Sequence, residues 1–162
     1  MSNSKTLVAY FSCSGTTRKV AGKLAEAADA DLFEIKPETA YTSADLNWQD
    51  NGSRSTQEKN DPASRPVIAD KVKDMASYQT VFVGFPIWWY TFPRIIETFL
   101  ESYDFSEKTV IPFATSGSSG MGGIDNEIKK LCSSQTSWKP GKRFASSVSE
   151  GTLKKWIEGL GL

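Results

Sequence analysis

Apolar residues recur along the chain in five short runs, and each run is followed by a segment with a different spacing. A short run rich in branched and aromatic residues is typical of a buried strand, whereas apolar residues three and four positions apart are typical of a helix. This alternation predicts an α/β fold, a doubly wound three-layer α/β/α arrangement with a parallel sheet. The expected strands are residues 7–11, 31–35, 80–85, 109–113 and 142–146, and the expected helices are marked by Val20–Ala28, Val67–Met75, Ile95–Leu100, Ile124–Leu131 and Leu153–Leu160.

Residues 37–66 interrupt this alternation with a long and mostly polar excursion. Its few large apolar side chains are Tyr41, Leu46 and Trp48. Loops of this length are uncommon inside compact domains unless they are functional or disordered. Two interpretations stay open: a surface excursion that these side chains pin to the body of the protein, or a lid over a cofactor. We expect one domain, residues 1–162, with the excursion near the edge of the sheet at which a cofactor would bind.

Charge and composition narrow the class of protein. The 162 residues include 19 lysines and arginines and 19 aspartates and glutamates, so we expect neither nucleic acid nor a membrane surface as a partner. No apolar run approaches the length of a membrane span or resembles a signal peptide, so the expected location is the cytoplasm. The absence of histidine excludes catalytic triads and histidine metal ligands. Two cysteines are too few for a zinc site, and we expect no metal.

The first expected strand ends abruptly in a turn made of hydroxyl residues and a glycine. Backbone N–H groups at the start of the following helix have no partner within that helix, and the helix dipole favours an anion there. The turn contains no lysine or arginine, which suits a dianion held by neutral donors, such as a phosphate monoester. Serine and threonine are also common helix caps, so the turn alone does not decide between the two roles. The candidate residues are Ser12, Ser14, Gly15, Thr16 and Thr17.

Two further loops follow buried strands directly and are therefore expected at the same edge of the sheet as the first. One carries three large rings in succession, which can stack on a flat heterocycle or pack on the next helix. The other is rich in serine and glycine and offers backbone groups to the polar edge of a ring. Together the three loops fit a phosphorylated planar heterocycle, for which flavin mononucleotide (FMN) is the best candidate. The two loops are Pro86-Ile87-Trp88-Trp89-Tyr90 and Thr115-Ser116-Gly117-Ser118-Ser119-Gly120.

In this order the three loops resemble the cofactor loops of the flavodoxin family, in particular of a flavodoxin-like subfamily from bacteria. Ser12-x-Ser14-Gly15-Thr16-Thr17 is similar to the flavodoxin phosphate loop, Thr/Ser-x-Thr/Ser-Gly-x-Thr. The resemblance covers Lys5 to Leu160 and implies a five-stranded parallel sheet in the order 2-1-3-4-5 with non-covalently bound FMN. It also implies that the first loop holds the phosphate. The residues implied for the flavin ring are Pro86, Trp88, Trp89 and Tyr90, with Ser116, Gly117, Ser118 and Gly120 on its other edge.

The resemblance implies electron transfer through the flavin, with a redox partner protein or a small-molecule electron donor or acceptor. Well-known flavodoxins are markedly acidic and lack the excursion, so an NAD(P)H- or quinone-dependent FMN oxidoreductase of the same fold is the alternative. Three other readings stay open. One is a low-molecular-weight phosphatase built on Cys13 and Arg18, although their spacing is one residue too short. The others are a dinucleotide-binding fold with Glu34 on the ribose, and a binding module that has lost its cofactor.

Overall fold

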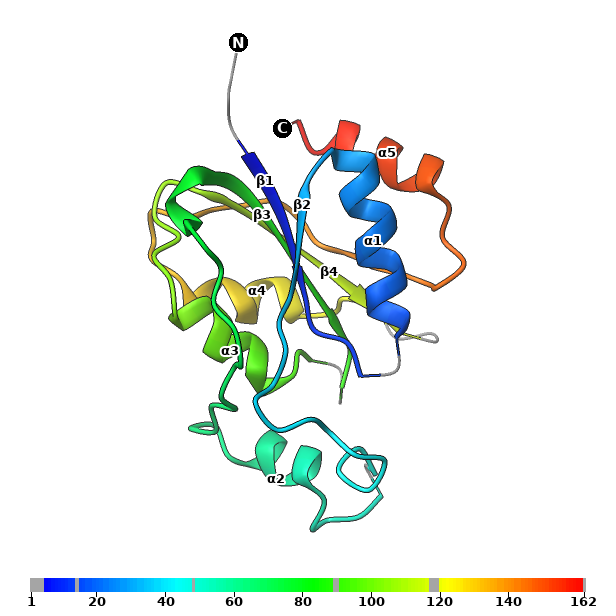
Figure 1. Ribbon diagram of the computed structural model, residues 1–162, viewed down its shortest axis with the longest axis vertical. Coiled ribbons are helices and arrows are strands. Elements are labelled where there is room, and N and C mark those ends of the chain that lie inside the picture. Colours follow the sequence, from blue (N-terminus) through cyan, green and yellow to red (C-terminus); the bar gives the residue numbers. More distant parts are fainter. Residues whose placement is uncertain (1–4, 14, 48, 89–90, 117–119, 162) are drawn as a thin grey trace.

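The computed structural model contains a parallel β-sheet with helices on both faces (Figure 1). It describes residues 5–13, 15–47, 49–88, 91–116 and 120–161. The strands are β1 (Lys5–Tyr10), β2 (Asp31–Glu34), β3 (Tyr78–Pro86), β4 (Thr109–Thr115), β5 (Ser137–Trp138) and β6 (Lys142–Phe144). The helices are α1 (Thr16–Ala28), α2 (Arg54–Asn60), α3 (Arg94–Glu101), α4 (Ile124–Ile128) and α5 (Glu150–Gly159), with 3₁₀ turns η1 (Met75–Ser77) and η2 (Lys129–Leu131).

The strand order is β2-β1-β3-β4, and both β5 and β6 pair with β4 on its remaining side. Every strand pair among the described residues is parallel. This confirms the predicted order 2-1-3-4-5. The fifth position differs in detail, because β5 lies beside Thr109 and Val110 whereas β6 lies beside Phe113 to Thr115. The predicted last strand therefore covers only part of that position.

Helices cover the two faces of the sheet separately. In Figure 1, α1 and α5 lie on one face and α3 and α4 on the other. Successive side chains of a strand point to opposite faces, so Leu7 and Ala9 join the α3 side whereas Val8 and Tyr10 join the α1 side. Burial on both faces explains why the strand reads as a continuous apolar run. Among the described helices, none is long and apolar enough to cross a membrane.

A glycine in the middle of the sheet leaves room for a neighbouring aromatic ring. Gly84 in β3 pairs with Tyr10 on one side and with Phe113 on the other. A Cβ atom at position 84 would lie 2.1 Å from Cζ of Phe113, so the ring of Phe113 occupies the space that a side chain would need. The carbonyl of Gly84 also accepts from the amide of Phe11 at 2.9 Å, just where the first loop begins.

The helix predicted over Val67–Met75 is wrong. This stretch contains no α-helix: Ile68 forms an antiparallel bridge with Pro37 just after β2, and Met75 at its end begins the 3₁₀ turn η1. The carbonyl of Val67 accepts from the amide of Glu38 at 2.8 Å, and the amide of Ala69 donates to Lys36 at 2.7 Å. Ile68, Val72 and Met75 thus reach the core from a segment whose backbone groups bond to another part of the chain, whereas Val67 is 59% exposed. Tertiary pairing overrides the weak helical spacing.

A helix forms instead inside the polar excursion. The side chain of Ser53 caps α2 by accepting from the amide of Thr56, and Arg54 pairs with Glu58 one turn later at 2.9 Å. Because α2 has no apolar stripe, hydrophobic periodicity gave no sign of it. A serine cap followed by an i, i+4 ion pair is the signal that was present. In Figure 1, α2 lies beyond the lower end of the sheet.

Candidate functional site at the carboxyl edge of the sheet

The carboxyl ends of β1, β3 and β4 meet at one edge of the sheet, at the lower end of Figure 1. The three loops singled out from the sequence leave from this edge, and the excursion lies beyond it. The direction of strand order switches between β1 and β3, and open parallel sheets bind ligands outside such a switch point. The expected placement of the three loops at one edge therefore holds for their described residues.

The first loop turns sharply before α1. Gly15 has a φ of 91° and a ψ of −8°, a left-handed conformation that glycine adopts without strain. Its amide donates to Oγ of Ser12 at 3.0 Å, which closes the turn. α1 begins at Thr16 and has no acidic residue in its first turn. The positive end of the helix dipole is thus not offset by a carboxylate of that turn, as an anion site requires.

Thr115 connects all three loops. Its Oγ1 lies 2.7 Å from Oγ1 of Thr17, and both side chains are buried. Its carbonyl accepts from the amide of Ile87 at 3.0 Å. Pro86 is the register partner of Thr115 in the sheet. The candidate residues from three distant parts of the sequence are therefore joined by hydrogen bonds at one point.

Replacing Thr17 with valine is expected to lower the free energy of unfolding by about 1–3 kcal/mol, because the buried hydroxyl of Thr115 then loses its partner. Adding Thr115→Val should restore part of this loss, since an apolar pair of the same shape leaves no polar group unpaired. Urea denaturation of the two single variants and the double variant measures the coupling. Purely additive losses would show that the two hydroxyls do not depend on each other.

Trp88 belongs to a cluster of three aromatic rings. Its ring centroid lies 5.7 Å from that of Phe11 and 5.6 Å from that of Tyr41, and both contacts are edge-to-face. Phe11 and Tyr41 also meet edge to face, at 5.7 Å. Trp88 and Thr91 exchange backbone hydrogen bonds at 2.9 and 3.0 Å. The cluster joins the first loop, the second loop and the excursion.

Two charged residues of α2 fix Tyr41. The guanidinium carbon of Arg54 lies 3.8 Å from the centre of the Tyr41 ring, and the Tyr41 hydroxyl donates to Glu58. Burial and this hydrogen bond raise the pKa of the Tyr41 hydroxyl well above its usual value, so the phenol stays protonated at neutral pH. Arg54 also bonds to Glu58 and to the carbonyl of Thr39. Tyr41 is thus held by α2 on one side, and by its contacts with Phe11 and Trp88 on the other.

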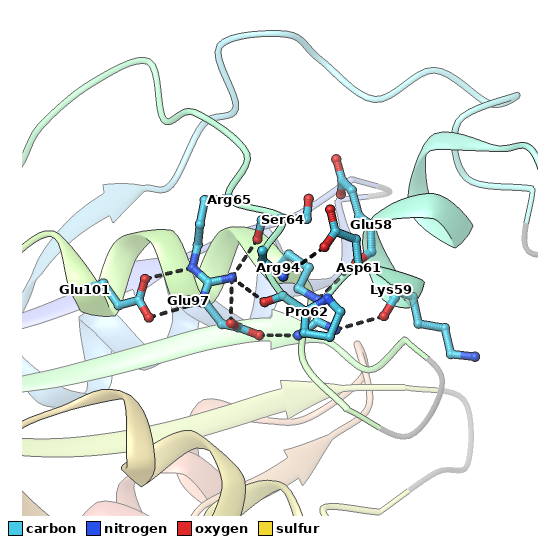
Figure 2. A network of polar contacts seen from close by, with 10 residues as sticks. Glu58, Lys59, Asp61, Pro62, Ser64, Arg65, Arg94, Glu97 and Glu101 are labelled. Carbon is cyan, nitrogen blue, oxygen red and sulfur yellow. Dashed lines mark hydrogen bonds and ion pairs between the residues drawn. The ribbon is translucent and has the colours of Figure 1, made fainter.

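Arginines of α3 and of the excursion hold α2 in place (Figure 2). Glu97 of α3 is buried, with 6% of its surface exposed, and it pairs with Arg65 at 2.9 Å and with Arg94 at 2.6 Å. Arg94 also donates to the carbonyls of Glu58 at 3.0 Å and Lys59 at 2.8 Å, near the end of α2. The carbonyl of Glu58 also accepts from the amide of Asp61, at 3.2 Å, just after the helix. One side chain thus joins a buried carboxylate to the end of a separate helix.

Arg65 closes the other end of the excursion. It forms a two-bond contact with Glu101, at 2.7 and 3.2 Å, and donates to the carbonyls of Pro62 and Ser64 (Figure 2). The described part of the excursion is therefore docked on α3 through Arg65 of the excursion and Arg94 of α3.

Arg143 of β6 is a candidate residue that the sequence did not suggest. It donates to the carbonyl of Ser116 at 2.5 Å and to its Oγ at 3.1 Å. Ser116 directly follows β4, so a positive charge lies beside the start of the third loop. The strand containing Arg143 has only weak apolar character, and only the pairing of β6 with the end of β4 brings the two together.

The structure gives no support to a phosphatase built on Cys13. Although Cys13 is exposed as a residue, loss of hydration raises the pKa of its thiol to about 12, with smaller opposing effects of Arg54 and Glu58. The nucleophile of such enzymes is a thiolate, which requires a lowered pKa. Arg18 pairs with Glu34 at 3.1 Å on the surface. The carboxylate of Glu34, which a dinucleotide-binding fold would use to bind a ribose, is therefore already paired with Arg18.

Several candidate residues lie outside the described residues: Ser14, Trp89, Tyr90, Gly117 and Ser118, together with Trp48 of the excursion. The described candidates lie at the expected edge, and Gly120 is exposed. Their contact with a cofactor stays a prediction.

The fold is that of a doubly wound α/β protein, and its candidate site lies at the carboxyl edge of the sheet, where the strand order switches between β1 and β3. The chain matches the sequence profile of the flavodoxin family over residues 5–160, and it belongs to that family. It matches none of the curated proteins by sequence.

Solved structures agree with this placement. A candidate flavoprotein from Bacteroides uniformis is 47% identical, with a TM-score of 0.91 and coverage of 97% of this chain and 99% of its own. Another from Bacteroides eggerthii is 44% identical, with a TM-score of 0.93 and coverage of 99% of each chain. A Lactobacillus acidophilus flavoprotein in complex with FMN is 23% identical, with a TM-score of 0.70 and coverage of 95% of this chain and 99% of its own. At that identity, the likeness concerns the fold alone.

Proposed function

We propose that this protein binds FMN non-covalently at the carboxyl edge of its sheet and transfers electrons through it. Membership of the flavodoxin family supports the proposal, as does the FMN complex of the Lactobacillus acidophilus protein, which shares the fold. The observation that carries it is the meeting of the three loops at Thr115, beside the start of α1. When bound, FMN supplies the redox chemistry, and the protein supplies binding, orientation and electrostatics.

The residues present fit such a ligand. Ser12, Thr16 and Thr17 bring hydroxyl groups to the start of a helix whose first turn contains no carboxylate, which is the donor set that a phosphate monoester needs. Gly15 in its left-handed conformation has no atom within 4 Å of a Cβ position, so backbone can be approached closely there. Trp88 of the second loop packs edge to face against Phe11, which directly precedes the first loop. The FMN phosphate is accordingly assigned to the first loop and the flavin ring to the second and third.

Retention of FMN through a desalting column tests the proposal. The protein is mixed with excess FMN, passed through the column and examined by absorbance. We expect a yellow protein fraction with about one flavin per chain. A colourless fraction, from protein shown to be folded by circular dichroism, would contradict FMN binding.

An NAD(P)H- or quinone-dependent oxidoreductase is the second candidate function. The docked excursion favours it, because an ordered helix beyond the cofactor edge restricts the approach of a large redox partner and can shape a site for a small one. Steady-state oxidation of NADH and NADPH by the FMN-loaded protein, with and without a quinone, separates the two candidates. Turnover supports the enzyme. No turnover, together with reoxidation of the reduced protein by a one-electron acceptor protein, supports the carrier.

A further inference from the structure

The cluster of Phe11, Tyr41 and Trp88 joins the excursion to two of the three loops at the carboxyl edge. Phe11 is buried and directly precedes the first loop, and Trp88 lies in the second loop. Tyr41 lies in the excursion, and its ring meets the other two edge to face, at centroid distances of 5.7 and 5.6 Å. The excursion is therefore in contact with the loop that was predicted to line the flavin ring.

The ring of Tyr41 is held from its other side by α2. The guanidinium of Arg54 lies over the ring, and the Tyr41 hydroxyl donates to the carboxylate of Glu58. Arg54 and Glu58 also pair with each other, at 2.9 Å. Turning the ring out of the cluster would break the cation–π contact or the hydrogen bond, so α2 stabilises the position of the ring.

Glu58 connects Tyr41 to α3 as well. Its side chain accepts from Tyr41, whereas its backbone carbonyl accepts from Nε of Arg94 at 3.0 Å. Arg94 in turn pairs with the buried carboxylate of Glu97 (Figure 2). Connected contacts thus run from Glu97 of α3 through α2 to Tyr41 and Trp88. Packed side chains and hydrogen bonds of this kind can couple distant parts of a protein.

Trp88 is only half-buried, and without Tyr41 its side chain would lose one of its two described ring contacts. A side chain that moves freely in the unbound protein has to be ordered when a ligand binds, which lowers the affinity by about two- to tenfold. A side chain that is already held avoids this cost. Tyr41 can therefore favour ligand binding through Trp88 without contacting the ligand.

We propose that Tyr41 is a positioning residue of the flavin site, and that its ring holds Trp88 in the conformation that binds the flavin. This inference rests on the proposed function. It implies that docking of the excursion and binding of FMN stabilise each other, because coupling between two equilibria is reciprocal. The excursion is then a working part of the flavin site.

Fluorescence titration of FMN and of riboflavin with the Tyr41→Leu variant tests the proposal. We expect both ligands to bind about two- to tenfold more weakly, and by the same factor, because they share the ring that Trp88 contacts. The fluorescence of the bound flavin should also rise, since Trp88 is no longer held against the ring. Tyr41→Phe keeps the ring in the cluster and should retain most of the affinity.

Tyr103→Leu is the matched control. Tyr103 is also half-buried, its ring contacts Phe99 and Phe105, and its hydroxyl accepts from the amide of Val72. It lies between the end of α3 and the start of β4, at the opposite edge of the sheet. Its loss should lower the free energy of unfolding much as Tyr41→Leu does, without weakening either flavin.

Limited digestion with trypsin provides a second measurement that does not depend on flavin fluorescence. Saturating FMN should slow cleavage of the unchanged protein at Arg54 and Lys59, because bound flavin favours the conformation in which Trp88 and Tyr41 hold α2 in place. Tyr41→Leu should lose this protection at saturating FMN, whereas Tyr103→Leu should keep it.

Four results would overturn the proposal: unchanged flavin affinity in Tyr41→Leu, an equal loss in Tyr103→Leu, equal losses in Tyr41→Phe and Tyr41→Leu, or protection by FMN that persists in Tyr41→Leu. Unchanged protein that retains no FMN contradicts the proposed function, and this inference with it. Protein that retains FMN with the same affinity in Tyr41→Leu contradicts this inference alone.

Discussion

Replacing Arg94 with methionine is expected to lower the free energy of unfolding by about 2–4 kcal/mol. The substitution removes one ion pair of the buried Glu97 and two charge-assisted hydrogen bonds to the end of α2. Arg65 remains as a partner of Glu97, which keeps the loss below that of an entirely unpaired buried charge. Urea denaturation measures the effect. Limited digestion with trypsin should also become faster at Arg54 and Lys59, because the excursion is no longer held on α3.

Lys130→Met is the matched control for Arg94→Met. Lys130 pairs with Glu127 at 3.3 Å with the same i, i+3 spacing, but both side chains are largely exposed, at 69% and 61%. Exposed pairs of this kind contribute at most about 1 kcal/mol. Equal small effects of the two substitutions would contradict the role assigned to Arg94.

Riboflavin is expected to bind about a hundredfold or more weakly than FMN. The two molecules share the flavin ring and differ in the phosphate, which the first loop is proposed to hold with hydroxyl and amide donors. Charge-assisted hydrogen bonds contribute about 1.5–3 kcal/mol each, so two of them already account for a hundredfold. Quenching of flavin fluorescence during titration with protein measures both dissociation constants.

Thr17→Val separates the phosphate from the ring in the same assay. We expect the variant to lose affinity for FMN and to keep its affinity for riboflavin, since a general loss of stability would weaken both ligands alike. Equal affinities of the unchanged protein for FMN and riboflavin would contradict the phosphate assignment.

Most of the fold could be predicted because most of its strands and helices have a recognisable local pattern of apolar residues. The strand at 80–85 is buried on both faces, and its run of apolar residues is unbroken. α3 has Ile95, Ile96 and Phe99 on the face that packs on the sheet. The segment at 67–75 has helical spacing without forming an α-helix, because the backbone partners of its first residues lie far away in the sequence, after β2. Spacing within a segment carries no information about such partners.

The position of the site could be predicted because its loops directly follow the ends of strands. The first loop, with its hydroxyl groups and Gly15, could be placed at the helix start from the sequence alone. The bond between Thr17 and Thr115 joins residues 98 positions apart, and no local pattern announces it. Arg143 and the role of Arg94 could not be predicted from the sequence for the same reason. The role of each depends on a contact with another element, which a local pattern does not show.

Phosphorus-31 NMR of FMN in the presence of the protein tests the central proposal most directly. The second pKa of a free phosphate monoester is about 6. Donors at the first loop favour the dianion, so they should lower this pKa. The resonance of bound FMN is expected to shift with one-to-one saturation and to remain that of the dianion below pH 6. A saturably bound FMN whose phosphate titrates as it does in free solution would contradict the placement of the phosphate in the first loop.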